Sequence, residues 1–258
     1  MNTSARAAPL PGLTPYASLL LLAAAGAWVG VILVARGMQE MPGTMGLALG
    51  PFIGVWTLMM AAMMLPSAAP FVALYTRTFT SRRATRFVNF VAGYLLAWAL
   101  ASLPAYAVGR LLMSVVDRYP GEGTAVVAAI FAACGLYQLT PVKSRCLARC
   151  RSPIALSFKY GSYGGALRDL RVGLSHGAFC LACCWALMAV LFSFGIMNVP
   201  AMILLAVVVL AEKVWARGPA FGRVVGAVAL ALAVAAVVHP GLAPGLHPAA
   251  HLGGMNGM

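Results

Sequence analysis

The sequence predicts an all-α protein, a polytopic transmembrane helical bundle of about seven spans. Two observations predict this fold class. First, 62% of the 258 residues are hydrophobic, only 9% are charged, and the mean hydropathy is +0.90, which lies outside the balance of a soluble globular domain. Second, the apolar residues gather in segments near the ~20 residues that cross a bilayer. A chain inside hydrocarbon must satisfy its own backbone hydrogen bonds, so these segments are expected to be helices.

Seven apolar segments follow one another along the chain. The first is longer than the core of a usual signal peptide, so we expect it to be retained as a span. The sixth is the shortest, and if one segment does not cross the bilayer, we expect it to be this one. The segments are 16–35, 51–75, 88–110, 124–142, 173–195, 199–213 and 221–238. Residues 16–240 are therefore predicted to form one bundle, between a cytoplasmic segment at 1–15 and a tail at 241–258.

The basic residues predict the orientation of this bundle. Of the 18 Lys and Arg residues, all but Arg36, Arg110 and Arg118 fall in alternate connecting segments. Because cytoplasmic loops carry an excess of Lys and Arg, the N-terminus is predicted inside and the C-terminus outside. The longest loop, 143–172, is then basic and cytoplasmic, and part of it is expected to lie along the membrane surface as a helix. Its basic residues occur in short clusters, so the formal net charge of +13 does not indicate nucleic-acid binding.

The stretch HGAFCLACCWALM in the fifth segment places one imidazole and three thiols on one helical face. At ~100° per residue, His176, Cys180 and Cys183 fall within a narrow arc, and Cys184 widens the same face. Polar side chains within a membrane are uncommon and tend to be functional. Each residue alone is compatible with packing, because Cys is a small, commonly buried side chain. Four such groups on one face favour a soft-metal or redox site.

A methionine-rich stretch, WTLMMAAMMLPSAAP, lies in the second segment at a similar predicted depth. Met59 and Met63 are one turn apart, as are Met60 and Met64, and thioethers spaced in this way suit Cu(I). Packing is the alternative, because Met often fills gaps in apolar helices. We predict Met59 and Met63 as ligands that reach the cysteine face from across the bundle.

Two further groups near the cytoplasmic side are candidate ligands. Cys146 and Cys150, in CLARC, are one turn apart beside several arginines, which favours thiolate and allows one soft ion to be chelated. Two unrelated reduced thiols are the alternative. Glu212 ends an apolar span and needs a partner, which is either a metal, His176 or a basic side chain. A structural pair with Lys or Arg explains it equally well.

The tail after residue 240 has no charged residue but carries His247, His251, Met255 and Met258, with His239 just before it. Its Gly and Pro content predicts a flexible external segment. We interpret it as a weak collector of metal ions, with chance occurrence of these residues as the alternative. Cys134, alone in the fourth segment, is predicted to be a packing residue.

Several strings in this order resemble a bacterial family of predicted metal-binding integral membrane proteins, long classed as a domain of unknown function. The strings are WTLMMAAMMLPSAAP, LTPVKSRCLARCRSP, KYGSYGGALRDLRVGLSHGAFCLACCWALMAVLFSFGIMN and VVLAEK, between about Met59 and Lys213. The resemblance implies a multi-spanning protein of the bacterial inner membrane. It also implies a metal site on Cys146, Cys150, His176, Cys180, Cys183 and Cys184.

The function predicted from these patterns is the handling of a soft transition metal, with copper favoured and zinc or iron as the other candidates. Transport, delivery and sensing all fit, with a soluble metallochaperone or a partner subunit as the expected protein partner. The sequence shows no ATP-binding loop, so any transport would be passive or coupled to another subunit. One alternative is a membrane metalloenzyme or oxygenase-type subunit that uses the same metal site. A second alternative is a thiol oxidoreductase that uses Cys180, Cys183 and Cys184.

Overall fold

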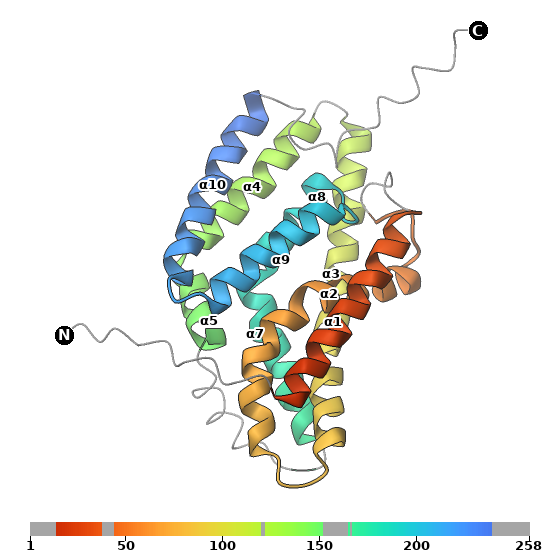
Figure 1. Ribbon diagram of the computed structural model, residues 1–258. Helices are drawn as coiled ribbons and strands as arrows, with labels where there is room; N and C mark the ends of the chain where they lie inside the picture. The colour runs from red at the N-terminus through yellow and green to blue at the C-terminus, as the bar shows by residue number, and fades with distance from the viewer. Residues whose placement is uncertain (1–13, 38–43, 120–121, 152–164, 166, 239–258) are drawn as a thin grey trace, which may run out of the picture.

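A computed structural model describes residues 14–37, 44–119, 122–151, 165 and 167–238, and every regular element in these ranges is helical (Figure 1). The predicted all-helical fold is therefore confirmed, and each of the seven apolar segments contains a helix. The helices are α1 (Pro15–Ala35), α2 (Leu49–Tyr75), α3 (Arg83–Arg118), α4 (Gly123–Leu139), α5 (Pro141–Arg151), α7 (Arg168–Ala189), α8 (Leu191–Phe194), α9 (Val199–Val214) and α10 (Gly218–Val238), with a short 3-10 turn, η1 (Thr76–Thr78), after α2.

Five of these helices are long and apolar enough to cross a membrane: α1, α2 with η1, α3, α7 with α8, and α10. A sixth span results if α4 and α5, which meet at an angle of 64°, count as one. Helix α9 has 16 residues, which at 1.5 Å per residue is about 24 Å and short of the ~30 Å hydrocarbon core. The seven-span count and its orientation therefore stay predictions.

Helices α2 and α7 form the centre of the bundle and are buried over most of their length. Helix α1 packs on α2, α3 packs on α7, and α10 packs on α4. In Figure 1, α9 lies between the α4–α10 pair and the α1–α2 pair, and it contacts α2, α7, α5 and α10. The end of α9 thus reaches both the central helices and the α4–α5 corner.

Glycines allow α3 and α7 to approach closely. A Cβ at Gly93 of α3 would collide with the backbone carbonyl of Leu170, and one at Gly173 of α7 would collide with that of Phe90. Small residues at helix contacts permit this spacing, which is common between membrane helices. At one end of the pair, Arg86 forms an ion pair of 3.1 Å with Asp169. This close contact fixes the rotation of α7 and so the direction of its cysteine face.

The predicted basic loop at 143–172 begins as a helix. Helix α4 ends at Leu139, inside the predicted fourth segment, the chain turns at Thr140, and α5 then carries CLARC. Cys146 and Cys150 therefore lie one helical turn apart, as the spacing predicts. Residues 152–164 and 166 of this loop, residues 1–13 of the N-terminal segment and the whole His/Met tail lie outside the described residues.

Candidate metal centre

The methionine segment of α2 meets the cysteine face of α7 in the centre of the bundle. The thiol of Cys184 lies 3.9 Å from the thioether sulfur of Met64. It also donates a hydrogen bond of 3.0 Å to the carbonyl of Cys180, one turn earlier in α7. Both cysteines are 1% exposed and Met64 is fully buried. One thiol and one thioether from different helices therefore meet in the buried interior of the bundle.

The Cys180 thiol is held by polar groups from two other helices. The ammonium of Lys213, at the end of α9, lies 2.8 Å from its sulfur, and the Tyr94 hydroxyl of α3 lies 3.1 Å from it. Lys213 also donates a hydrogen bond of 3.1 Å to the Ser67 hydroxyl of α2. An ammonium so close to sulfur stabilises the thiolate form, which is the form that binds metals. We call Cys180, Cys184, Met64, Tyr94, Ser67 and Lys213 the sulfur cluster.

Cys183 lies between the sulfur cluster and α5. Its thiol lies within hydrogen-bonding reach of the Cys184 thiol on one side and of the Cys150 thiol on the other, and its backbone carbonyl accepts a hydrogen bond of 2.5 Å from Lys143. Cys146 lies one turn away from Cys150 and is partly buried against the core. The structure thus brings Cys150, the second cysteine of CLARC, to the cysteine face of α7.

His176 lies at the other end of the same face, among aromatic rings. Its imidazole stacks on Phe71 with ring centroids 4.3 Å apart, and the rings of Phe90 and Tyr94 lie at 6.0 and 5.9 Å. The side chain is 4% exposed, and its Nδ1 atom has no hydrogen-bond partner in the described part of the chain. Burying a nitrogen without a hydrogen-bond partner costs free energy. The Nδ1 lone pair is therefore available to bind a cation.

Glu212 is part of a separate buried network at the α4–α5 corner. Its carboxylate accepts hydrogen bonds of 2.6 Å from Lys143 and 2.6 Å from Gln138, and it is 1% exposed. We call Glu212, Lys143 and Gln138 the carboxylate cluster. The partner of Glu212 is therefore a basic side chain, the structural alternative that the sequence left open. Its two carboxylate oxygens are both occupied.

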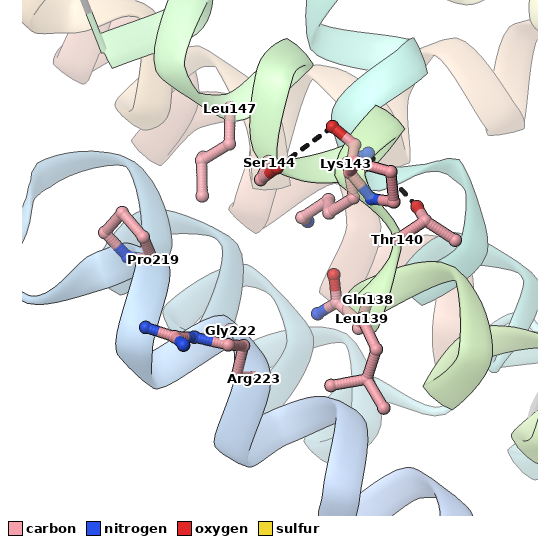
Figure 2. Close-up of a pocket in the computed structure, with 10 residues that line it drawn as sticks. Gln138, Leu139, Thr140, Lys143, Ser144, Leu147, Pro219, Gly222 and Arg223 are labelled. Carbon is pink, nitrogen blue, oxygen red and sulfur yellow. Dashed lines mark hydrogen bonds between the residues drawn. The ribbon is translucent and has the colours of Figure 1, made fainter.

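A cavity of about 330 Å³ lies beside the carboxylate cluster, between the α4–α5 corner and α10. Figure 2 shows Gln138 and Leu139 on one side of it and Pro219 and Arg223 of α10 on the other. The cavity is lined by neither the cysteines of α7 nor the methionines of α2. It is therefore distinct from the sulfur cluster.

Most of the chain matches a known protein family. Residues 53–236 match the family described as PpoB2, copper chaperone. The chain belongs to the PpoB2 copper chaperone family. The matched region runs from α2 to α10 and so contains both the sulfur cluster and the carboxylate cluster. No curated protein and no solved structure matches the chain.

Membership in the PpoB2 family associates the chain with copper, and the donor set of the sulfur cluster fits that ion. Thiolate and thioether ligands select Cu(I) among the common biological metals. Two sulfurs 3.9 Å apart can be joined by one ion with metal–sulfur bonds of about 2.3 Å. Within the described ranges, however, no three His, Cys, Asp or Glu side chains are arranged to hold a metal ion. Methionine must therefore complete any site that forms here without rearrangement.

The structure keeps only part of the predicted ligand set together. The Cys184 thiol lies within hydrogen-bonding reach of the Cys180 and Cys183 thiols and contacts Met64, and Cys183 also reaches Cys150. His176 lies among aromatic rings, and Glu212 is paired with Lys143. Met59 and Met63 are buried in the core, but the thioether that reaches a thiol is that of Met64. Whether each of these residues binds metal stays a prediction.

The sequence did not predict the two polar partners of the Cys180 thiol, Tyr94 and Lys213, or Ser67, which accepts a hydrogen bond from Lys213. A lysine at the end of an apolar span usually extends towards water, so its place at the helix end offered no reason to expect Lys213 beside a buried thiol. The adjacent Glu212 was a usable signal. Consecutive helical residues point about 100° apart, so two charged neighbours in a buried helix end require two different partners.

Proposed function

We propose that this member of the PpoB2 family is a membrane-embedded copper chaperone that holds Cu(I) between α2 and α7. Cys180 and Cys184 supply the thiolate ligands and Met64 supplies the thioether. The observation that carries this proposal is the 3.9 Å approach of the Cys184 and Met64 sulfurs, next to the Cys180 thiol and inside the region that matches the family.

The chemistry of the donors suits binding and release. Cu(I) accepts two or three soft ligands, whereas structural zinc sites normally close four ligands around the ion. A site of two thiolates and one weak thioether donor leaves the ion open to attack by a thiol of another protein. Copper can then move by ligand exchange without a redox step. A soluble metallochaperone or a partner subunit is the expected donor or acceptor.

We place the protein in the bacterial inner membrane, with seven spans, the N-terminus inside and the C-terminus outside. The five apolar helices, or six with the α4–α5 pair, support membrane insertion, and the distribution of Lys and Arg supports the orientation. Within this arrangement, the His/Met tail would collect copper outside. His176, with its unpartnered Nδ1, and Cys150 beside Cys183 are the nearest further donors along α7.

The proposal is tested by measuring Cu(I) binding to the purified full-length protein in detergent, in competition with a Cu(I) chelator. We expect Cys180→Ser and Cys184→Ser each to abolish high-affinity binding, because serine offers no soft donor. Cys134→Ser is the matched control. Cys134 is a buried cysteine of α4 whose charged neighbours are Lys143 and Glu212, so this variant should bind copper like the wild type.

Wild-type binding that survives both substitutions on α7 would contradict the proposed site. Loss of binding in the Cys134 variant as well would show that the assay reports folding rather than ligation. Thermal unfolding of each variant in the same detergent separates these outcomes.

A further inference from the structure

The Lys213 ammonium lies 2.8 Å from the Cys180 sulfur, and none of the carboxylates in the described residues forms an ion pair with it. The chain has only five acidic residues. Asp169 is paired with Arg86 and Glu212 with Lys143. Asp117 and Glu122 flank the connection between α3 and α4, and Glu40 lies outside the described residues. In the described part of the chain, Lys213 therefore has only the Cys180 sulfur and the Ser67 hydroxyl as polar partners.

We propose that Lys213 makes the sulfur cluster selective for monovalent over divalent cations. This inference rests on the proposed function, because it concerns the ion that the same sulfurs hold. Lys213 acts as a specificity residue: it does not bind the ion but fixes one positive charge beside the position that the ion takes.

The distances determine how strongly this charge acts. The ammonium nitrogen lies 2.8 Å from the Cys180 sulfur, so an ion bonded to that sulfur at about 2.3 Å lies within about 5 Å of it. Coulomb repulsion grows with the charge of the ion and is twice as large for Zn(II) as for Cu(I) at the same position. Because the ammonium and the bound ion lie inside the bundle, salt screens the repulsion between them only weakly.

The position of Lys213 is fixed, so the ammonium cannot easily move away from a bound ion. Its helix contacts α2, α7, α5 and α10, and the preceding residue, Glu212, is anchored by Lys143 and Gln138. The Ser67 hydroxyl of α2 accepts a hydrogen bond from the ammonium, 3.1 Å away. Helix α2 therefore orients the Lys213 ammonium through Ser67 and also supplies a soft ligand, Met64.

The test compares Cu(I) with Zn(II), which have the same number of electrons and differ in charge. Dissociation constants for both ions are measured on the wild type and on Lys213→Met, in detergent and in competition with chelators. We expect the ratio of Zn(II) to Cu(I) affinity to rise on the order of tenfold or more in the variant. Arg217→Gln is the matched control. Arg217 is exposed just beyond α9, so this substitution also removes one positive charge, but not one beside the sulfurs.

A second variant keeps the lysine. Ser67→Asp places a carboxylate beside the ammonium and neutralises its charge, so it should shift the ratio in the same direction as Lys213→Met. If Lys213→Met does not fold, the Ser67→Asp result decides. An unchanged ratio in the folded variants, with copper binding intact, would overturn this inference and leave the proposed function standing. Absence of Cu(I) binding in the wild type would instead overturn the proposed function.

Discussion

Two neighbouring residues of α9, Glu212 and Lys213, belong to two clusters that differ in how their charge is balanced. In the carboxylate cluster, the Glu212 carboxylate has Lys143 and Gln138 at 2.6 Å each, and no site on it is left for a metal. In the sulfur cluster, the Lys213 ammonium has a thiol at 2.8 Å and no carboxylate among the described residues. In the carboxylate cluster the charged groups satisfy one another. In the sulfur cluster the Lys213 ammonium has, among the described groups, only a sulfur to balance its charge.

The difference indicates different roles. A buried ion pair that satisfies both partners fixes the arrangement of helices, since removing either partner leaves an uncompensated charge. An ammonium beside a thiol favours the thiolate form, which is the form that binds a soft cation. We therefore assign the carboxylate cluster to structure and the sulfur cluster to copper, and the two can be separated by mutation.

The largest expected effect is on stability, at the carboxylate cluster. Lys143→Met leaves Glu212 buried and unpaired, because Lys143 and Glu212 are 3% and 1% exposed. We expect the variant to lose about 3–5 kcal/mol of unfolding free energy. Denaturant or thermal unfolding in detergent measures this loss.

The double variant Lys143→Met, Glu212→Met is the control for this prediction. Replacement of a whole buried ion pair by apolar side chains of similar volume is often neutral, so most of the lost stability should return, and copper binding should persist. A double variant as unstable as the single one would show that the pair is not what Lys143 contributes.

The next effect concerns copper at the sulfur cluster. Met64→Leu should weaken Cu(I) binding by about tenfold or more, since even residues that only support metal ligands contribute 10–100-fold. Met59→Leu and Met63→Leu are matched controls on the same buried helix and should bind copper like the wild type. If Met59→Leu or Met63→Leu weakens binding and Met64→Leu does not, the ligand assignment on α2 is wrong.

The smallest effect is expected from Tyr94→Phe. The variant removes the hydroxyl that lies 3.1 Å from the Cys180 sulfur and donates a hydrogen bond of 3.2 Å to the Met64 carbonyl. We expect a loss of about 1 kcal/mol in stability, with copper still bound. A complete loss of copper binding would make Tyr94 essential to the site rather than a positioning group.

The sequence predicted the helices well because long apolar segments in a poorly charged chain allow few other structures. It also placed His176, Cys180 and Cys183 on one face of α7, with Cys184 at the edge of that face, since that depends only on helical periodicity. It could not show which methionine meets Cys184, because Met59, Met63 and Met64 are all buried and the choice depends on how α2 is rotated against α7. The partners of Lys213 and Glu212 depend on contacts between α9 and four other helices, which periodicity within one helix does not encode.

The most direct test of the sulfur assignment is X-ray absorption on the wild-type protein loaded with one equivalent of Cu(I). We expect the atoms bonded to copper to be mainly sulfur, from Cys180, Cys184 and Met64, with one sulfur neighbour lost in Met64→Leu and none lost in Met59→Leu. A first shell of nitrogen and oxygen atoms alone would contradict it, because the thiols and thioether between α2 and α7 would then be packing residues.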